Sequence, residues 1–163
     1  MLQTKSNAGF LMSRIRHLGG RAWERYLIES GVDAFNGAQG RILYVLWERG
    51  RMTITEIGRQ TSLAKTTLTS MLDRMETGGL ISRIPDKRDR RRIYIELTDW
   101  ARELRPAYNA ISERTNELYY RGFSKAELAQ FEGYLLRIIE NLEASEGTDK
   151  RKEDHGHEEN LDG

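Results

Sequence analysis

The 163-residue chain is long enough for one domain with a buried core of its own. It contains 38% hydrophobic and 31% charged residues, which is typical of a globular protein. The absence of cysteine excludes disulfides, thiolate metal sites and cysteine nucleophiles. No apolar run approaches the roughly 20 residues that span a bilayer, and the N-terminus lacks a secretion signal. We therefore expect a cytoplasmic protein that does not contact membranes.

Charge is distributed unevenly along the chain. Residues 144–163 contain three basic and seven acidic residues, whereas Arg83 to Arg92 contains six basic and two acidic residues in ten positions. Because the formal net charge is only +1, this concentrated basic segment indicates a local contact with an anionic partner.

Two helices are expected in the N-terminal part. Apolar residues recur every three or four positions between residues 4 and 29, a helical pattern that the Gly19-Gly20 pair weakens. A second helix is expected from Asn36, a good N-cap, to Gly50. It contains the longest apolar run, residues 42–47, so we expect this helix to lie centrally.

The next segment predicts two helices joined by a turn. Thr53 and Glu56 have the spacing of a capping box, which starts a short helix. After a turn at residues 61–63, a helix is expected from Ala64 to Thr77, where glycines end it. Its apolar side chains are expected to face inward (Leu68, Met71, Leu72 and Met75) and its polar ones outward (Lys65, Thr66, Thr67, Ser70 and Arg74).

After the glycines the hydrophobic period changes from that of a helix to that of a strand. Residues 80–84 and 93–97 predict two strands of a hairpin with a basic tip. Asp86 and Asp89 are unexpected in a segment that faces a polyanion. We interpret them as carboxylates that hold arginines in one rotamer by bidentate pairing.

Two further helices are expected in the C-terminal part. Thr98 caps a long helix that Pro106 is expected to kink, because proline lacks an N–H group and clashes with the preceding turn. A capping box at residues 124–127 starts the last helix. Residues 144–163 are polar and without periodicity, which predicts a disordered acidic tail.

The order short helix, turn, helix and basic hairpin is that of a winged helix-turn-helix. In such a unit the second helix enters the major groove of DNA, and the hairpin, or wing, contacts the minor groove. Short hydroxyl side chains approach bases closely, and lysine and arginine suit phosphates. We expect the DNA contacts to come from Lys65, Thr66, Thr67, Ser70, Arg74, Arg88, Asp89, Arg90 and Arg91.

These segments resemble the MarR family of winged-helix transcription regulators. The resemblance covers about residues 8–142. It rests on Gly79-Leu80-Ile81-Ser82-Arg83, on Asp86-Lys87-Arg88-Asp89-Arg90-Arg91 and on Leu97-Thr98, at a spacing that is specific in combination. The resemblance implies a mostly α-helical fold with a small β-hairpin wing (α+β). It also implies a homodimer that binds a pseudo-palindromic operator and a small phenolic or anionic effector that releases the DNA.

On this basis the chain divides into four parts. They are an N-terminal dimerisation helix (1–35), a winged DNA-binding lobe (36–98), C-terminal dimerisation helices (99–143) and the tail (144–163). A homodimer is also expected because the apolar seams of the end helices would otherwise stay exposed. Candidate effector residues near the junction of lobe and helices are Arg14, His17, Tyr44, Trp47 and Trp100.

Other functions have less support. No phosphate-binding loop, nucleophile elbow or paired histidine and carboxylate lies on a predicted element, so we expect no enzyme activity, cofactor or metal site. The deep, narrow groove of A-form RNA excludes a recognition helix. We expect a repressor that occludes a promoter. The alternative is a protein-interaction or non-specific nucleoid-binding module without a ligand response.

Overall fold

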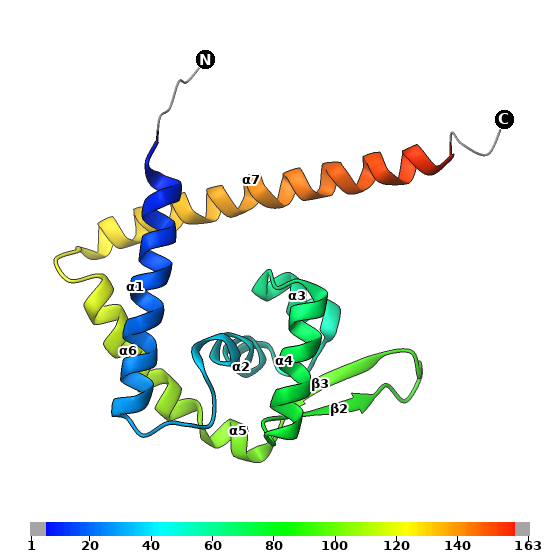
Figure 1. The fold of residues 1–163 in the computed structure, drawn as a ribbon, viewed down its shortest axis with the longest axis horizontal. Helices are drawn as coiled ribbons and strands as arrows, with labels where there is room; N and C mark the ends of the chain where they lie inside the picture. Colours follow the sequence, from blue (N-terminus) through cyan, green and yellow to red (C-terminus); the bar gives the residue numbers. More distant parts are fainter. Residues whose placement is uncertain (1–5, 159–163) are drawn as a thin grey trace. The chain divides into compact units, whose positions relative to one another are not determined.

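The computed structural model describes the backbone of residues 6–158 and the side chains of residues 6–146. The chain divides into two compact units between Tyr119 and Tyr120. The first unit holds helices α1 to α6 and a three-stranded sheet, and the second holds helix α7 (Figure 1). The prediction of a mostly helical fold with a small β wing is confirmed. Among the described residues, no helix combines the length and the apolarity needed to cross a membrane.

Helices α1 (Ala8–Glu29) and α6 (Arg105–Tyr119) lie side by side in the first unit. They meet at Gly19, where an added Cβ would lie 1.3 Å from the Tyr119 hydroxyl oxygen. Gly19 therefore leaves room for the ring of Tyr119. This packing explains why a glycine stands inside the helix, which the helical pattern of the sequence did not reveal. At the other end of α1, Arg114 pairs with Glu29 at 2.7 Å.

Helix α1 begins at Ala8, four residues later than expected. The Ser6 hydroxyl accepts a hydrogen bond from the Ala8 N–H at 3.1 Å, so the polar residues before Ala8 lead into the helix without being part of it. Residues 4 and 5 of the predicted helix lie outside the described residues.

The winged lobe consists of three helices and three short strands. In chain order these are α2 (Gly37–Arg49), β1 (Met52–Thr53), α3 (Ile54–Thr61), α4 (Lys65–Thr77), β2 (Ile81–Pro85) and β3 (Ile93–Leu97). The strands are antiparallel in the order β1-β3-β2. Strand β1 was not predicted, because two residues are too few to show a period-two pattern. The rest of the predicted helix-turn-helix and hairpin is confirmed within one or two residues.

The core of the lobe lies between α2, the inner faces of α3 and α4, and the sheet. Ile42, Leu43 and Leu46 of α2 are fully buried, which confirms the central position expected for that helix. Helix α4 contributes Leu68, Leu72 and Met75, which are equally buried. Burial of side chains of this size stabilises the lobe by about 1.5–3 kcal/mol each. The inner face of α4 is therefore fixed to the core, and its outer face is exposed to solvent.

The two predicted caps in the C-terminal part are confirmed. The Thr98 hydroxyl accepts from the Ala101 N–H at 3.2 Å and starts α5 (Asp99–Glu103). Helix α5 ends at Glu103 with Leu104 as its C-cap, and α6 starts at Arg105, so the expected break next to Pro106 is present. The Ser124 hydroxyl accepts from the Glu127 N–H at 3.2 Å and starts α7 (Lys125–Glu158).

The expectation of a disordered tail from residue 144 is wrong for residues 144–158, which continue α7. An existing helix adds each further residue without a new nucleation cost, and alanine, glutamate, lysine and arginine all favour the helix. The lack of regularly spaced apolar residues therefore indicates that this segment has no face for burial in a core. It does not indicate that the helix ends. Residues 159–163 lie outside the described residues.

Candidate nucleic-acid interface

Helix α4 presents one continuous polar face to solvent. Lys65, Thr66, Thr67 and Ser70 are all exposed, whereas Leu68 and Leu72 are buried. The Arg74 guanidinium donates to the Ser70 hydroxyl at 3.3 Å and so extends along the same face toward the start of the helix. The structure thus brings together the five helix residues that were predicted to contact DNA.

The first turn of α4 is suited to anions. Its N-cap residue, Ala64, has no side-chain oxygen, and no side chain caps the helix. The first backbone N–H groups of a helix have no partner inside the helix, and the helix dipole makes this end electropositive. With the Lys65 ammonium group beside them, these groups form a site that favours a phosphate.

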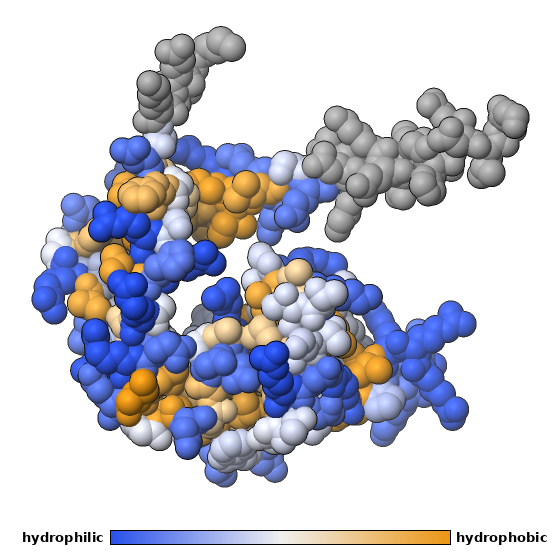
Figure 2. Space-filling view, in the orientation of Figure 1, coloured by the Kyte–Doolittle hydropathy of each residue, from blue (hydrophilic) through white to orange (hydrophobic). Residues whose placement is uncertain are grey.

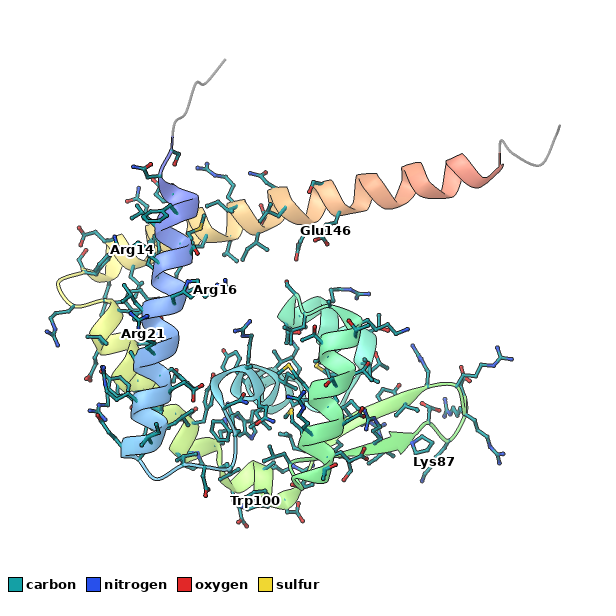
Figure 3. The ribbon with its side chains drawn as sticks, viewed as in Figure 1. Arg14, Arg16, Arg21, Lys87, Trp100 and Glu146 are labelled. Atoms are coloured by element: carbon teal, nitrogen blue, oxygen red, sulfur yellow. The ribbon has the colours of Figure 1, made fainter. Side chains whose placement is uncertain are left out.

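The wing is a hairpin whose end is almost entirely charged. Strands β2 and β3 pair as far as Pro85 and Ile93, and residues 86–92 form the turn. Arg88, Arg90 and Arg91 are exposed on this turn. Figure 2 shows the end of the wing as a uniformly hydrophilic surface, and Figure 3 shows Lys87 at the same end.

The two wing aspartates bind the backbone of the turn. Asp86 Oδ1 accepts from the N–H groups of Arg88 at 2.6 Å and Asp89 at 3.0 Å, and Asp89 Oδ1 accepts from the Arg91 N–H at 3.0 Å. The expected bidentate pairs between these carboxylates and arginines are not formed among the described residues. Neighbouring N–H groups are closer to a short aspartate side chain than the far end of an arginine is. Asp86 and Asp89 therefore set the shape of the turn and leave the guanidinium groups free.

The pH dependence of this turn follows from Asp86. Hydrogen bonds from the Arg88 and Asp89 N–H groups hold the pKa of the Asp86 carboxyl below its ordinary value of 3.8. A lowered pKa in the folded state means that the carboxylate stabilises the turn fully above 3.8 and that this contribution is lost as the pH falls through the lowered pKa. We expect the wing to keep its shape at neutral pH and to loosen only in acid.

Replacing Asp86 by alanine is expected to speed amide hydrogen exchange at residues 88 and 89 by about fivefold for each hydrogen bond removed. Asp86→Asn is the matched control, because it keeps an accepting Oδ1 and removes only the charge, so its exchange should fall between those of the native protein and of Asp86→Ala. Exchange measured by mass spectrometry or NMR distinguishes the two. Exchange unchanged from the native protein in Asp86→Ala would show that the carboxylate does not order the turn.

A groove of about 790 Å³ lies between α3, α4 and the base of the wing. Its cationic residues are Arg59, Lys65, Arg91 and Arg92, and its apolar residues include Ile54, Leu63, Leu68 and Ile93. Arg59 and Arg92 were missed as site residues. Arg59 lies two positions after the buried Ile57, on the outer side of a short amphipathic helix, and this spacing was the available signal.

The candidate effector residues do not form one site. Tyr44 and Trp47 lie together, with ring centroids 6.0 and 5.0 Å from that of Tyr108. Trp100 is exposed and lies against Gly79, at the end of the wing strands. Arg14 lies on α1 far from Trp100 (Figure 3).

His17, the remaining candidate, lies on the exposed side of α1, where its Nδ1 is 2.7 Å from the Ser13 carbonyl oxygen. The aromatic cluster itself is larger than expected, because Trp23 and Phe35 also contact Tyr108. The Trp23 Nε1–H is buried and has no hydrogen-bond partner among the described residues.

Both units expose apolar surface along a helix. On α1 the exposed apolar side chains are Phe10, Leu11, Met12, Ile15 and Leu18, and Figure 2 shows apolar surface along this helix. On α7 they are Tyr134, Leu136, Ile138, Ile139 and Leu142. Surfaces of this kind are uncommon on monomers and mark contacts with other chains.

Known proteins similar to this chain are transcriptional regulators. The model of the MarR family matches residues 35–93. The HTH-type transcriptional regulator FarR of Neisseria gonorrhoeae is 33% identical over 81 residues, which are 50% of this chain and 53% of FarR. The regulator YcgE of Bacillus subtilis is 35% identical over 100 residues, 61% of this chain and 64% of YcgE. The matched segments thus span between half and two thirds of these relatives.

A solved structure with a similar fold is that of overoxidized AbfR bound to DNA. It is 28% identical, with a TM-score of 0.60, and the match covers 81% of this chain and 93% of AbfR. The similarity therefore includes the helices that flank the winged lobe.

Proposed function

We propose that the chain is a transcriptional regulator of the MarR family that binds double-stranded DNA sequence-specifically. The observation that carries the proposal is that the winged lobe exposes both α4 and the wing to solvent. Helix α4 presents short hydroxyl side chains beside an uncapped N-terminus, and the wing presents three free arginines. FarR and YcgE are named transcriptional regulators, and the similar AbfR structure is bound to DNA.

In this proposal α4 enters the major groove and the wing follows the phosphates into the adjacent minor groove. Thr66, Thr67 and Ser70 read base edges, whereas Lys65 and Arg74 contact phosphates. Arg59 and Arg92 add to the cationic groove between α3 and the wing. Binding over a promoter in the cytoplasm excludes RNA polymerase, so repression is the proposed outcome.

The proposed active form is a homodimer built by residues 1–35 and 99–143. The exposed apolar faces of α1 and α7 support it, since each is left uncovered in a single chain. A dimer places two copies of α4 on a pseudo-palindromic site, with half-site centres about 34–36 Å apart. Sedimentation equilibrium tests the dimer directly, and a monomer at micromolar concentration would contradict it.

A small phenolic or anionic effector is proposed to release the DNA. Of the candidate residues, Tyr44 and Trp47 both pack against Tyr108. Trp23 contacts the same ring, and its buried Nε1–H, which has no partner among the described residues, offers a donor to a polar ligand. Arg14 and Trp100 lie too far apart to act together in one subunit (Figure 3). Thermal-shift screening with phenolic and aromatic acids, followed by DNA-release assays, tests the effector.

Capture of genomic fragments by the purified protein at physiological salt tests the proposed function. Enrichment of fragments that share a palindromic motif is the expected result. Flat, salt-sensitive enrichment would contradict sequence specificity and would favour the non-specific nucleoid-binding alternative. Absence of DNA binding would favour the protein-interaction alternative.

Replacing Thr67 by alanine is expected to reduce discrimination between the enriched site and unrelated DNA by about 1–3 kcal/mol, while leaving non-specific binding nearly unchanged. Thr77→Ala is the matched control, because Thr77 is an exposed threonine at the far end of the same helix. Competition binding with specific and random duplexes measures both variants. Equal effects of the two substitutions would show that Thr67 does not contact a base.

A further inference from the structure

Arg83, on strand β2, connects the base of the wing to α4. Its guanidinium Nη2 donates to Asp73 Oδ1 at 2.6 Å, and its Nη1 pairs with Glu76 Oε2. Its backbone N–H also donates to Glu76 Oε1 at 3.3 Å. The Arg83 side chain is only 22% exposed, against 62% for Asp73 and 42% for Glu76. One largely covered cation therefore contacts two exposed carboxylates on the neighbouring helix.

Those two carboxylates are placed unfavourably for a helix that binds DNA. Asp73 and Glu76 lie in the C-terminal half of α4, where the helix dipole disfavours anions. They also lie on the element that is proposed to approach phosphates, and uncompensated carboxylates there would repel the DNA. Arg83 supplies the compensating charge from outside the helix.

The same contacts hold the wing in place. Ile81 and Ile95 anchor the strands in the core, and Arg83 is paired with Ile95 in the register of the sheet. Beyond Arg83, the hairpin extends into solvent. Burial disfavours the charged guanidinium, but the carboxylates outweigh this cost and raise the pKa of Arg83 above its ordinary value. The ion pairs thus join α4 to the strand from which the wing extends.

We propose that Arg83 is a positioning residue for DNA binding, which cancels the charge of Asp73 and Glu76 and fixes the wing to α4 without contacting DNA itself. The inference rests on the proposed function. Of the cations in the basic segment of residues 83–92, Arg83 is therefore not a DNA contact. Its role is to position the other groups of the interface. The side chains of α4 and the wing arginines then approach DNA as one rigid surface.

A double-mutant cycle tests the proposal. Its variants are Arg83→Met, the pair Asp73→Asn with Glu76→Gln, and all three changes together. Binding is measured on the enriched genomic fragment and on a random-sequence duplex of about 30 base pairs, and thermal melting verifies the fold. We expect Arg83→Met to weaken binding about tenfold. The variant with Asp73→Asn and Glu76→Gln should bind DNA with an affinity within about threefold of that of the native protein. Adding Arg83→Met to this variant should lower the affinity by less than about threefold more.

An equal loss from Arg83→Met in both backgrounds would overturn the proposal, because it would show that Arg83 contacts the DNA. Arg102→Met is the matched control. Arg102 also bridges two carboxylates, Asp99 at 2.7 Å and Glu96 at 3.5 Å, but it lies on α5. Its replacement should change DNA binding by less than about twofold. An effect of Arg102→Met as large as that of Arg83→Met would also overturn the proposal.

Amide exchange of strand β2 tests the contact without DNA. Arg83→Met and the variant with Asp73→Asn and Glu76→Gln should each speed exchange at residues 82–84 to the same extent, and the triple variant should add nothing. Additive effects would contradict the contact. If the native protein binds neither DNA probe, the proposed function fails, and the exchange result still decides whether Arg83 holds the wing.

Discussion

Alanine at both Arg88 and Arg90 is expected to weaken DNA binding by about 4 kcal/mol for a dimer that uses both wings, on the order of 1 kcal/mol for each arginine replaced. Both side chains are exposed on the turn of the wing. Because Asp86 and Asp89 bond to backbone N–H groups, the guanidinium groups have no carboxylate partner in the turn to release before binding. Their full charge is available to the DNA.

The salt dependence distinguishes a DNA contact from a general loss of charge. Each phosphate contact contributes about 0.9 to the slope of log K against log salt concentration, so the double variant should lower the slope by about 1.8 per protomer. Arg16→Ala with Arg21→Ala is the matched control, since it removes the same charge from exposed positions on α1 (Figure 3). Equal slopes for the two double variants would show that the wing does not contact the phosphates.

The ends of the elements, both in the winged lobe and at the start of α7, could be predicted because they are set by local signals. Thr53 with Glu56 and Ser124 with Glu127 form reciprocal capping boxes in the structure, and each is visible in the sequence as a spacing of three residues. The glycines after α4, and the change of the hydrophobic pattern to the two-residue period of a strand, indicate in the same way where the wing begins. Signals of this kind depend on neighbours within one turn of helix or one strand.

The contacts between elements could not be predicted in the same way. In the sequence Arg83 is one member of a basic run, and only the fold shows that its charge is used on α4, seven and ten residues earlier in the chain. The candidate effector residues share a suitable chemistry, but the Trp100 ring lies against Gly79, whereas the rings of Tyr44 and Trp47 pack against Tyr108. The same limit applies to the wing aspartates, whose partners depend on the conformation of the turn.

Tyr108 is expected to be the side chain whose loss most weakens the connection between the winged lobe and the helices that flank it. Its ring centroid lies 5.2 Å from that of Trp23 on α1, 6.2 Å from that of Phe35 before α2, and 5.0 Å from that of Trp47 on α2. Aromatic pairs at such distances contribute about 0.5–1.5 kcal/mol each beyond the burial of area. One ring of α6 therefore joins three segments of the chain.

Replacing Tyr108 by alanine should lower the free energy of unfolding by about 3 kcal/mol, the low end of the cost of removing a buried aromatic ring, because Tyr108 is partly buried. For a chain of this size that corresponds to a fall of roughly 10 °C in the melting temperature, measurable by calorimetry. Tyr108→Phe is the control. Because it keeps the ring and removes only the hydroxyl group, it should stay within about 1 kcal/mol of the native protein.

The comparison of these two variants also tests the role of the cluster in signalling. If an effector acts at Tyr44 and Trp47, the ring of Tyr108, which contacts both side chains, is a direct route for the response from α2 to α6. Tyr108→Phe should then respond to the effector like the native protein. Tyr108→Ala, assayed below its melting temperature, should bind DNA and fail to release it. Normal release by the alanine variant would show that the flanking helices receive the signal by another route.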